Sequence, residues 1–331
     1  MKLILMKKEK SVKKPEKVVD RSSISYRAKI FIKKNLAGWL IMLPGVALFS
    51  FFVWAPLVQN ISLSFYRTVG FERAEFVGFA NYVRVFGDPI FIQAFKNTFK
   101  YVLYSLAIGF IIPIFLGLLL SEVVHFKSLF RIGLYFPSII SGIAVVIMWS
   151  YLFNPNPGAV LNAAARIFGL GPFKFLDNPK ASIPLIVLTM TWRGMGATAL
   201  IYLSALQNVD TAQYEAARID GANAWQRMRH ITLPHLRPTV RMLFILQIIS
   251  VFQVFYEPLV MTKGGGPNGA SVSLLLLSYQ YAFQKFDASA SAAVGVILSF
   301  IIIALTVVYL RLSARRDKDL IRPFRPRRAK R

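Results

Sequence analysis

Long runs of apolar residues recur along the chain and are separated by polar segments. Each run is about 20 residues long, the length an α-helix needs to cross the hydrocarbon core of a bilayer. Helices of soluble proteins are shorter, with a mean of about 11 residues. The pattern therefore predicts an all-α polytopic membrane protein with six transmembrane helices. They are expected at residues 36–58, 101–120, 132–153, 183–206, 239–261 and 292–312.

The polar segments divide the chain into regions with different expected surroundings. The two ends are rich in Lys and Arg, and the first helix is set apart from the other five by a long loop. We expect a basic N-terminal tail at 1–35, the first helix at 36–58, an extracytoplasmic loop at 59–100, a permease core at 101–312 with a cytoplasmic loop at 207–238, and a basic tail at 313–331.

The distribution of charge predicts the orientation in the membrane. The 331 residues include 40 Lys and Arg against 15 Asp and Glu. Of the basic residues, 29 lie in the tails and the loops on one side, 10 lie on the other side, and Arg193 falls inside a helix. Cytoplasmic segments carry the excess of Lys and Arg, so both termini and residues 207–238 are predicted to be cytoplasmic. Basic clusters beside membrane spans favour contact with the lipid bilayer and not with nucleic acid.

The residue types that most enzymes and metal sites use are scarce. The sequence has no cysteine and only three histidines, His125, His230 and His235, which are too dispersed to indicate a metal site. It has no Gly-Lys-Ser/Thr nucleotide loop and no metalloprotease motif. We therefore expect no catalysis, no metal and no cofactor in this chain, so that any ATP and Mg²⁺ would bind to another subunit.

The cytoplasmic loop at 207–238 has the pattern of two short helices and a turn. Asp210 and Gln213 have the spacing of an N-cap box, so the first helix should start directly after Asp210. Gly221 can end it with a positive φ. A second helix is predicted to run until Pro234 stops it.

This loop also carries a longer motif, Glu-Ala-Ala, three residues, Gly, nine residues, Ile-x-Leu-Pro, which matches from Glu215 to Pro234. The motif resembles the signature of permease subunits of ATP-binding-cassette (ABC) importers, and the resemblance covers roughly residues 37–313. It implies the type I ABC importer permease fold, in which this loop is the coupling helix that docks on the ATPase. Further segments, at 79–82, 136–141, 149–155 and 261–267, resemble the branch of the maltose and glycerol-phosphate permeases. The residues that the resemblance assigns to ATPase coupling are Tyr214, Glu215, Ala216, Ala217, Asp220, Gly221, Ile231, Leu233 and Pro234.

The resemblance also implies a function and a set of partners. The chain would be the permease subunit of an ATP-driven, binding-protein-dependent importer of a sugar or oligosaccharide, in a bacterial or archaeal cell membrane. Its partners would be cytoplasmic ATP-binding subunits that hold ATP–Mg, a second permease and an extracytoplasmic solute-binding protein. The second permease would be another copy of this chain or, as is common in this branch, a different paralogue. A non-sugar solute is the alternative. An ion-coupled secondary carrier is disfavoured, because Glu257 is the one intramembrane acid and no inverted repeat is visible.

Polar residues inside two predicted helices suggest a route for the solute, since such residues usually face a bundle interior or a water-filled path. On a helical projection of the fifth helix, Gln247, Ser250, Gln253 and Glu257 share one face.

The fourth predicted helix has a weaker polar stripe. Thr189, Arg193 and Ser204 share a face, whereas Thr191 and Thr198 project to the opposite side. Both stripes are candidates for the translocation path. They could equally seal a contact with a neighbouring helix or with a second permease subunit.

Overall fold

The computed structural model describes residues 24–122 and 126–320. The larger part of the predicted basic tails, at 1–23 and 321–331, lies outside the described residues, as does His125. The chain divides into two compact units, and the boundary follows Gln59.

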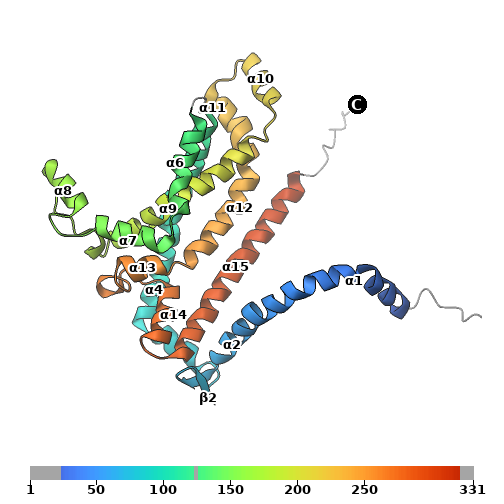
Figure 1. Cartoon of the computed structure of the whole chain (residues 1–331), viewed down its shortest axis with the longest axis vertical. Helices are drawn as coiled ribbons and strands as arrows, with labels where there is room; N and C mark the ends of the chain where they lie inside the picture. Colours follow the sequence, from blue (N-terminus) through green and yellow to red (C-terminus); the bar gives the residue numbers. More distant parts are fainter. Residues whose placement is uncertain (1–23, 123–125, 321–331) are drawn as a thin grey trace, which may run out of the picture. The chain divides into compact units, whose positions relative to one another are not determined.

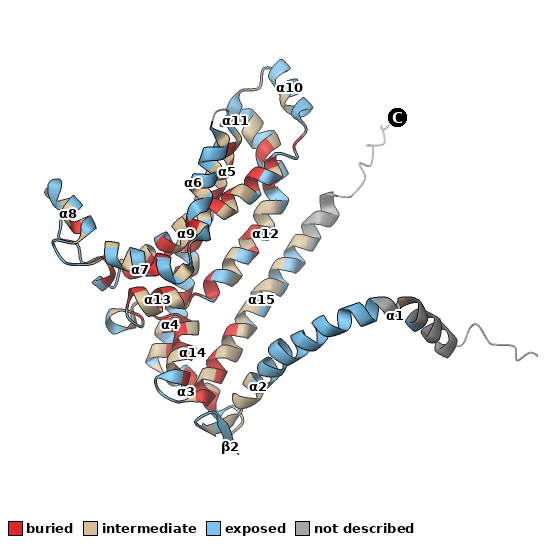
Figure 2. Cartoon of the chain, viewed as in Figure 1, coloured by how far each residue is buried: buried red, intermediate tan, exposed pale blue. Residues whose placement is uncertain are grey.

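The first unit is a long helix with a π-helical turn inside it. It comprises α1 (Ile24–Phe49), the turn Ser50–Trp54 and most of α2 (Ala55–Leu63) (Figure 1). Its apolar window runs over Gly38–Leu63, so the first predicted transmembrane helix is confirmed with a later end. No residue of this window is buried, and Ile41 is 80% exposed (Figure 2). Such an apolar, uncovered helix suits a lipid environment.

The second unit begins outside the predicted helices with a small hairpin. Strands β1 (Tyr66–Val69) and β2 (Glu72–Phe76) pair antiparallel, with an irregularity between Arg67 and Thr68. The short helix α3 (Ala80–Gly87) follows. The hairpin is the one sheet among the described residues, so the all-α prediction holds apart from this loop.

The second transmembrane helix starts earlier than predicted. It runs without a break from Pro89 to Glu122 through α4 (Pro89–Tyr104), a π-helical turn and α5 (Ile111–Glu122). Asp88 caps its start by accepting a 3.0 Å hydrogen bond from the Ile90 amide, and Pro89 occupies the first turn. The prediction placed this stretch in the loop at 59–100 because it counted apolar residues alone.

The third predicted helix, 132–153, is two helices. α6 (Lys127–Ile139) and α7 (Gly142–Leu152) meet at a bend of 94°. Ile140 and Ser141 between them have extended backbone. The predicted span covers most of both helices but misses the bend between them. Apolar residues continue across the bend, so the hydrophobic pattern does not mark it.

The fourth predicted helix is confirmed as α9 (Ser182–Leu206). Between α7 and α9 lies a loop with the short helix α8 (Val160–Ile167) and a 3₁₀ turn, Phe175–Asp177. Asn162 of α8 is 1% exposed, and its amide holds the loop together through Asn154, Pro155, Asn156 and Phe173.

The fifth predicted helix, 239–261, is wrong at both ends. The apolar helix in this region runs over Ala224–Phe252 and includes α12 (Leu233–Phe252), while α13 (Tyr256–Met261) is separate. The break follows from Pro258, which has no N–H to donate back along the helix. The Val254 carbonyl accepts instead from the Ser273 hydroxyl at 2.6 Å.

The last helices of the described residues are α14 (Leu274–Phe283) and the long α15 (Ala288–Leu320), which begins with the sixth transmembrane segment. Within the described residues, five helices are long and apolar enough to cross a membrane, or six if the bent α6–α7 pair is one span. Figure 1 places α10 (Thr211–Ile219) and α11 (Ala224–Arg227) at one end of the second unit, and α3 with the hairpin at the other end.

Glycine allows α9 to sit close to two neighbouring helices. A Cβ atom at Gly196 would lie 1.7 Å from the Leu134 carbonyl oxygen of α6, and one at Gly117 of α5 would lie 2.8 Å from the Tyr202 Cβ. Small residues at such contacts permit the close packing on which membrane helices depend. Several residues of α9, among them Ala199, Tyr202 and Leu203, are buried, and Figure 2 shows buried residues along this helix.

Candidate functional site: an exposed loop and a polar pocket

Two regions of the second unit contain the predicted site residues. The first, called the coupling loop here, is residues 207–238. Its first helix, α10, starts as predicted at Thr211, and the Asp210 carboxylate accepts a 2.9 Å hydrogen bond from the Ala212 amide. Gly221 has a φ of +76°, which lets the chain turn after α10.

The capping box of this loop lies at the second helix and not at the first. The Asn223 side chain accepts from the Gln226 amide at 2.9 Å, and the Gln226 side chain accepts from the Asn223 amide at 2.8 Å. At Asp210, by contrast, Gln213 contributes only a backbone bond. The Asn-x-x-Gln spacing was the available signal for the second box.

The second helix does not stop at Pro234, which corrects the prediction. The π-helical turn Met228–Thr232 leads from α11 directly into α12, and Pro234 occupies the first turn of α12. A proline has no backbone N–H to donate to the preceding turn. It is tolerated here because that preceding turn is π-helical and already departs from the α-helical hydrogen-bond pattern. The coupling loop is therefore rigidly continuous with a membrane helix.

Most of the coupling residues predicted from the motif lie on the surface of this loop. Glu215, Ala216, Asp220 and Gly221 are exposed. Tyr214 joins the two helices, because its hydroxyl lies 2.9 Å from that of Thr232. Ala217, Asp220, Gly221 and Ile231 line a shallow hollow together with Ala222, Gln226, Arg227 and His230. Leu233 is 37% exposed, and Pro234 is half-buried.

Large apolar side chains next to this hollow are uncovered. Ile219 is 87% exposed and Trp225 is 63% exposed. Exposed aromatic and aliphatic residues beside a concave, polar-rimmed surface are typical of a protein–protein contact. The loop therefore has the form of a docking element.

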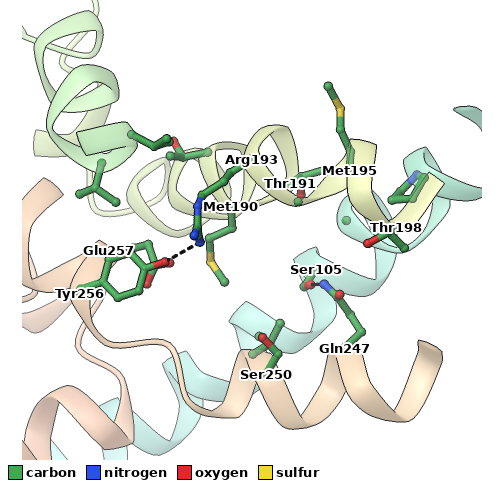
Figure 3. A pocket seen from close by; sticks show the side chains of 17 residues that line it. Ser105, Met190, Thr191, Arg193, Met195, Thr198, Gln247, Ser250, Tyr256 and Glu257 are labelled. Carbon is green, nitrogen blue, oxygen red and sulfur yellow. Dashed lines mark hydrogen bonds between the residues drawn. The ribbon is translucent and has the colours of Figure 1, made fainter. Parts of the chain in front are cut away.

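The second region is a cavity of about 280 Å³ between α7, α9, α12, α13 and the π-helical turn Ser105–Gly109 (Figure 3). We call it the polar pocket. Its lining residues are Ser105, Gly109, Pro113, Val145, Val146, Thr189, Met190, Thr191, Arg193, Gly194, Met195, Thr198, Gln247, Ser250, Val251, Tyr256 and Glu257.

Two long-range hydrogen bonds cross the polar pocket. The Arg193 guanidinium donates from Nη1 to the Tyr256 hydroxyl at 3.0 Å, and the Gln247 amide donates to the Ser105 hydroxyl at 2.5 Å (Figure 3). The first bond joins α9 to α13, and the second joins α12 to the second transmembrane helix. The pocket therefore depends on all of these helices holding their positions.

Five of the six residues predicted for the translocation path line this pocket, namely Thr189, Arg193, Gln247, Ser250 and Glu257. The sixth, Gln253, does not. It is exposed at the end of α12 and donates to the Ile249 carbonyl. The helical projection failed there because α12 ends at Phe252, so Glu257 reaches the pocket from a different helix.

The weaker stripe on α9 was also assigned incorrectly in part. Thr191 and Thr198, projected to the far side, line the polar pocket, whereas Ser204 is exposed elsewhere. The pocket bends around α9, so more than one face of this helix reaches it. Sequence reasoning missed Ser105 entirely, because a π-helical turn gives no signal in an apolar pattern.

Comparison with known proteins places this architecture in context. The model of the family described as "Binding-protein-dependent transport system inner membrane component" matches residues 109–318. The arabinooligosaccharides transport permease AraP of Halalkalibacterium halodurans is 33% identical over 284 residues, which cover 86% of this chain and 89% of AraP. The lactose transport permease LacF of Rhizobium radiobacter is 32% identical, over 86% of this chain and 95% of LacF.

Two further comparisons extend this result. The sn-glycerol-3-phosphate transport permease UgpA of Yersinia pestis is 29% identical over 84% of this chain and 94% of UgpA. The structure of a bacterial ABC transporter involved in the import of the acidic polysaccharide alginate contains a chain that superposes with a TM-score of 0.78. That chain is 25% identical, and the superposition covers 87% of this chain and 99% of that one. The importer permease fold predicted from the motif is confirmed by this match.

Proposed function

This chain belongs to the family of binding-protein-dependent transport system inner membrane components, and we propose that its polar pocket is half of a solute path coupled to an ATPase. It is a membrane-embedded permease subunit of an ABC importer. The observation that carries the coupling proposal is the motif from Glu215 to Pro234, which coincides with an exposed helix–turn–helix continuous with α12.

The proposed solute is a sugar or an oligosaccharide. AraP, LacF and the alginate importer are named for the transport of saccharides, and UgpA is named for a polyol phosphate. The pocket offers hydroxyl and amide groups from Thr189, Thr198, Ser250 and Gln247, which suit a solute with many hydroxyls. Import of an unrelated solute is the alternative, and identification of the solute in transport assays decides between them.

The proposed driving force is ATP hydrolysis on a separate chain that holds ATP–Mg. The coupling loop supports this proposal, because Ile219 and Trp225 are exposed beside a hollow that a partner can fill. Small residues at Ala216 and Ala217 permit close approach of a second helix. Movement of the docked ATPase would then pass directly into α12, which lines the polar pocket.

The proposed assembly has two permeases, two ATP-binding subunits and an extracytoplasmic binding protein. One of the solved alginate importer structures is a complex with a periplasmic protein bound to an alginate pentasaccharide. The second permease is expected to be a different paralogue. The proposed membrane is that of a bacterial or archaeal cell, and the excess of 29 over 10 basic residues supports a cytoplasmic position for both termini.

Cysteine labelling tests the role of the polar pocket. The sequence has no cysteine, so a single cysteine can be introduced at a chosen position. Ser250 lines the pocket, whereas Leu243 of the same helix is 9% exposed and belongs to the buried core of the protein. A polar thiol reagent should modify S250C in the assembled importer and leave L243C unmodified. Solute should slow the reaction of S250C. Equal labelling of both positions, or a reaction of S250C that solute does not slow, would contradict the path.

Purification from the native host tests the coupling proposal. Mild solubilisation of tagged protein followed by mass spectrometry should recover an ATP-binding subunit, a second permease and a binding protein. Gly221→Asp, which disturbs the turn of the coupling loop, should lose the ATP-binding subunit and retain the second permease. Absence of any ATPase from the wild-type sample, with crosslinking included, would contradict the proposal.

A further inference from the structure

Arg193 is a basic residue inside a helix that is long and apolar enough to cross the membrane. It lies near the centre of α9 (Ser182–Leu206) and its side chain lines the polar pocket. A charged side chain at this depth costs about 3 kcal/mol or more for membrane insertion. An ionisable residue inside a span usually marks a functional site. Because Arg193 faces the polar pocket, its function is expected to involve what this pocket binds.

The guanidinium has few partners of its own. Nη1 donates to the neutral Tyr256 hydroxyl at 3.0 Å, and Nε is buried without any hydrogen-bond partner (Figure 3). No ion pair to Arg193 occurs within the part of the chain that the structure describes. Since a guanidinium has five N–H donors and favours planar carboxylate or phosphate groups, most of its capacity is unused.

Glu257 is the acidic residue nearest to this cation in the pocket. It has an electrostatic interaction with Arg193, but no ion pair forms. Glu257 is 6% exposed and lies in the first turn of α13. Tyr256 stands next to it and takes the hydrogen bond from Arg193. Glu257 therefore lies near Arg193 in the pocket without pairing directly with it.

The other polar groups that face the solute space are neutral. They are the hydroxyls of Ser105, Thr189, Thr191, Thr198 and Ser250 and the amide of Gln247. The pocket therefore combines the Arg193 guanidinium, most of whose donors are unused, with neutral hydrogen-bonding groups and the single carboxyl group of Glu257.

We propose that Arg193 binds an anionic group of the transported solute, so that the importer prefers a sugar or polyol with one carboxylate or phosphate over its neutral counterpart. This inference rests on the proposed function and specifies its substrate class. The hydroxyls bind the sugar, and the guanidinium pairs with the anion through two parallel hydrogen bonds. Tyr256 holds the guanidinium in place while the pocket is empty.

The competing role for Arg193 is purely mechanical. In that role, its bond to Tyr256 fastens α13 to α9 and the charge has no part in selection. The two roles differ in what Tyr256→Phe does. A fastening role predicts that Y256F and R193Q have the same effect, whereas an anion-binding role predicts that Y256F keeps the preference for acids.

The test is equilibrium binding to the complete importer in nanodiscs, without binding protein, by saturation-transfer NMR titration. The probes are matched pairs: uronate disaccharides of the galacto, gluco and manno series with their carboxyl-reduced forms, and sugar phosphates with the free sugars. In the wild type, at least one anionic probe should bind at least tenfold more tightly than its neutral partner. The series that shows this distinguishes a carboxylate ligand from a phosphate ligand.

The variants then assign the preference to the guanidinium. R193Q should remove the preference and leave the affinity for the neutral probe within about threefold, R193K should keep part of it, and Y256F and E257Q should keep or increase it. Equal binding within every pair, no binding of any anionic probe, or a preference that survives R193Q would overturn the proposal. Loss of the preference in Y256F as well would identify the fastening role. Failure of the wild-type chain to assemble with an ATPase counts instead against the proposed function.

Discussion

The coupling loop and the polar pocket are built by opposite means. In the loop, the fixing bonds join residues of the loop to one another, such as the reciprocal pair of Asn223 and Gln226. In the pocket, they join distant helices, as between Ser105 and Gln247. A short motif can therefore specify the loop, whereas the pocket exists only when the whole bundle has assembled.

The two regions also differ in how far they are covered. Trp225 in the loop is 63% exposed, while Thr189 and Glu257 in the pocket are 1% and 6% exposed. The loop leaves apolar surface for another protein, and the pocket presents polar groups to a small internal space. The comparison teaches that local substitutions should uncouple the loop without unfolding the bundle, while substitutions at helix contacts should destroy the pocket itself.

The largest effect is expected at Gly196, where α6 approaches α9. In Gly196→Ala the new Cβ would lie 1.7 Å from the Leu134 carbonyl oxygen, a backbone atom that can move only with its helix. We expect a loss of about 3 kcal/mol or more in stability, seen as a lower unfolding temperature in detergent and a low yield. Gly194→Ala is the matched control, because no atom lies within 4 Å of its Cβ position. Similar behaviour of the two variants would contradict the close contact.

The second effect, on transport and not on folding, is expected at Gly221. Its φ of +76° is unfavourable for a β-branched residue, so Gly221→Val should reduce solute uptake at least tenfold while the permease pair still assembles. Gly70→Val places the same residue at a φ of +61° in the outer hairpin, also without close neighbours. It should transport normally. Equal loss of uptake in both variants would show that strain alone, and not docking, is responsible.

A smaller and local effect is expected in the outer loop between α7 and α9. Asn162→Ala removes a buried amide that donates to several carbonyls and accepts from the Phe173 amide at 2.8 Å. Loss of such bonds costs about 1–3 kcal/mol, and hydrogen exchange should increase over residues 154–173 alone. Asn178→Ala removes one exposed bond, to the Lys180 amide, and should leave exchange unchanged. Faster exchange in α9 would mean that the loop supports the bundle.

The smallest effect is expected at the cap of α10. Asp210→Ala removes the 2.9 Å bond from the Ala212 amide at an exposed position, which costs about 1 kcal/mol of local helix stability. The ATPase should bind several-fold more weakly, and the unfolding temperature of the bundle should not change. Asp210→Asn, which keeps a capping oxygen, should restore binding. A shift of the unfolding temperature would contradict the claim that the coupling loop is stabilised independently of the helix bundle.

Much of the fold followed from the apolar runs. The first, fourth and sixth transmembrane helices were predicted nearly within their observed bounds, and the start of α10 was predicted from Asp210. The breaks were not predicted. The bend at Ile140–Ser141 and the end of α12 at Phe252 lie inside continuous apolar sequence, so hydrophobicity does not report them.

The pocket was predicted only as far as polar residues in spans could indicate it. Arg193 and Glu257 were identified because charges in apolar runs are conspicuous. Ser105, Thr191 and Thr198 were not, because their place in the pocket depends on a π-helical turn and on the way neighbouring helices surround α9. Such arrangements arise from tertiary packing, which a single helical projection does not contain.

Site-specific photocrosslinking in intact membranes tests the central claim, that the coupling loop docks on a separate ATPase. A photoreactive phenylalanine analogue would replace Trp225, 63% exposed in the loop, or Phe71, 58% exposed in the outer hairpin. Mass spectrometry of the adducts should identify an ATP-binding protein from position 225 and none from position 71. No ATPase adduct at position 225, or equal adducts at both positions, would contradict the account.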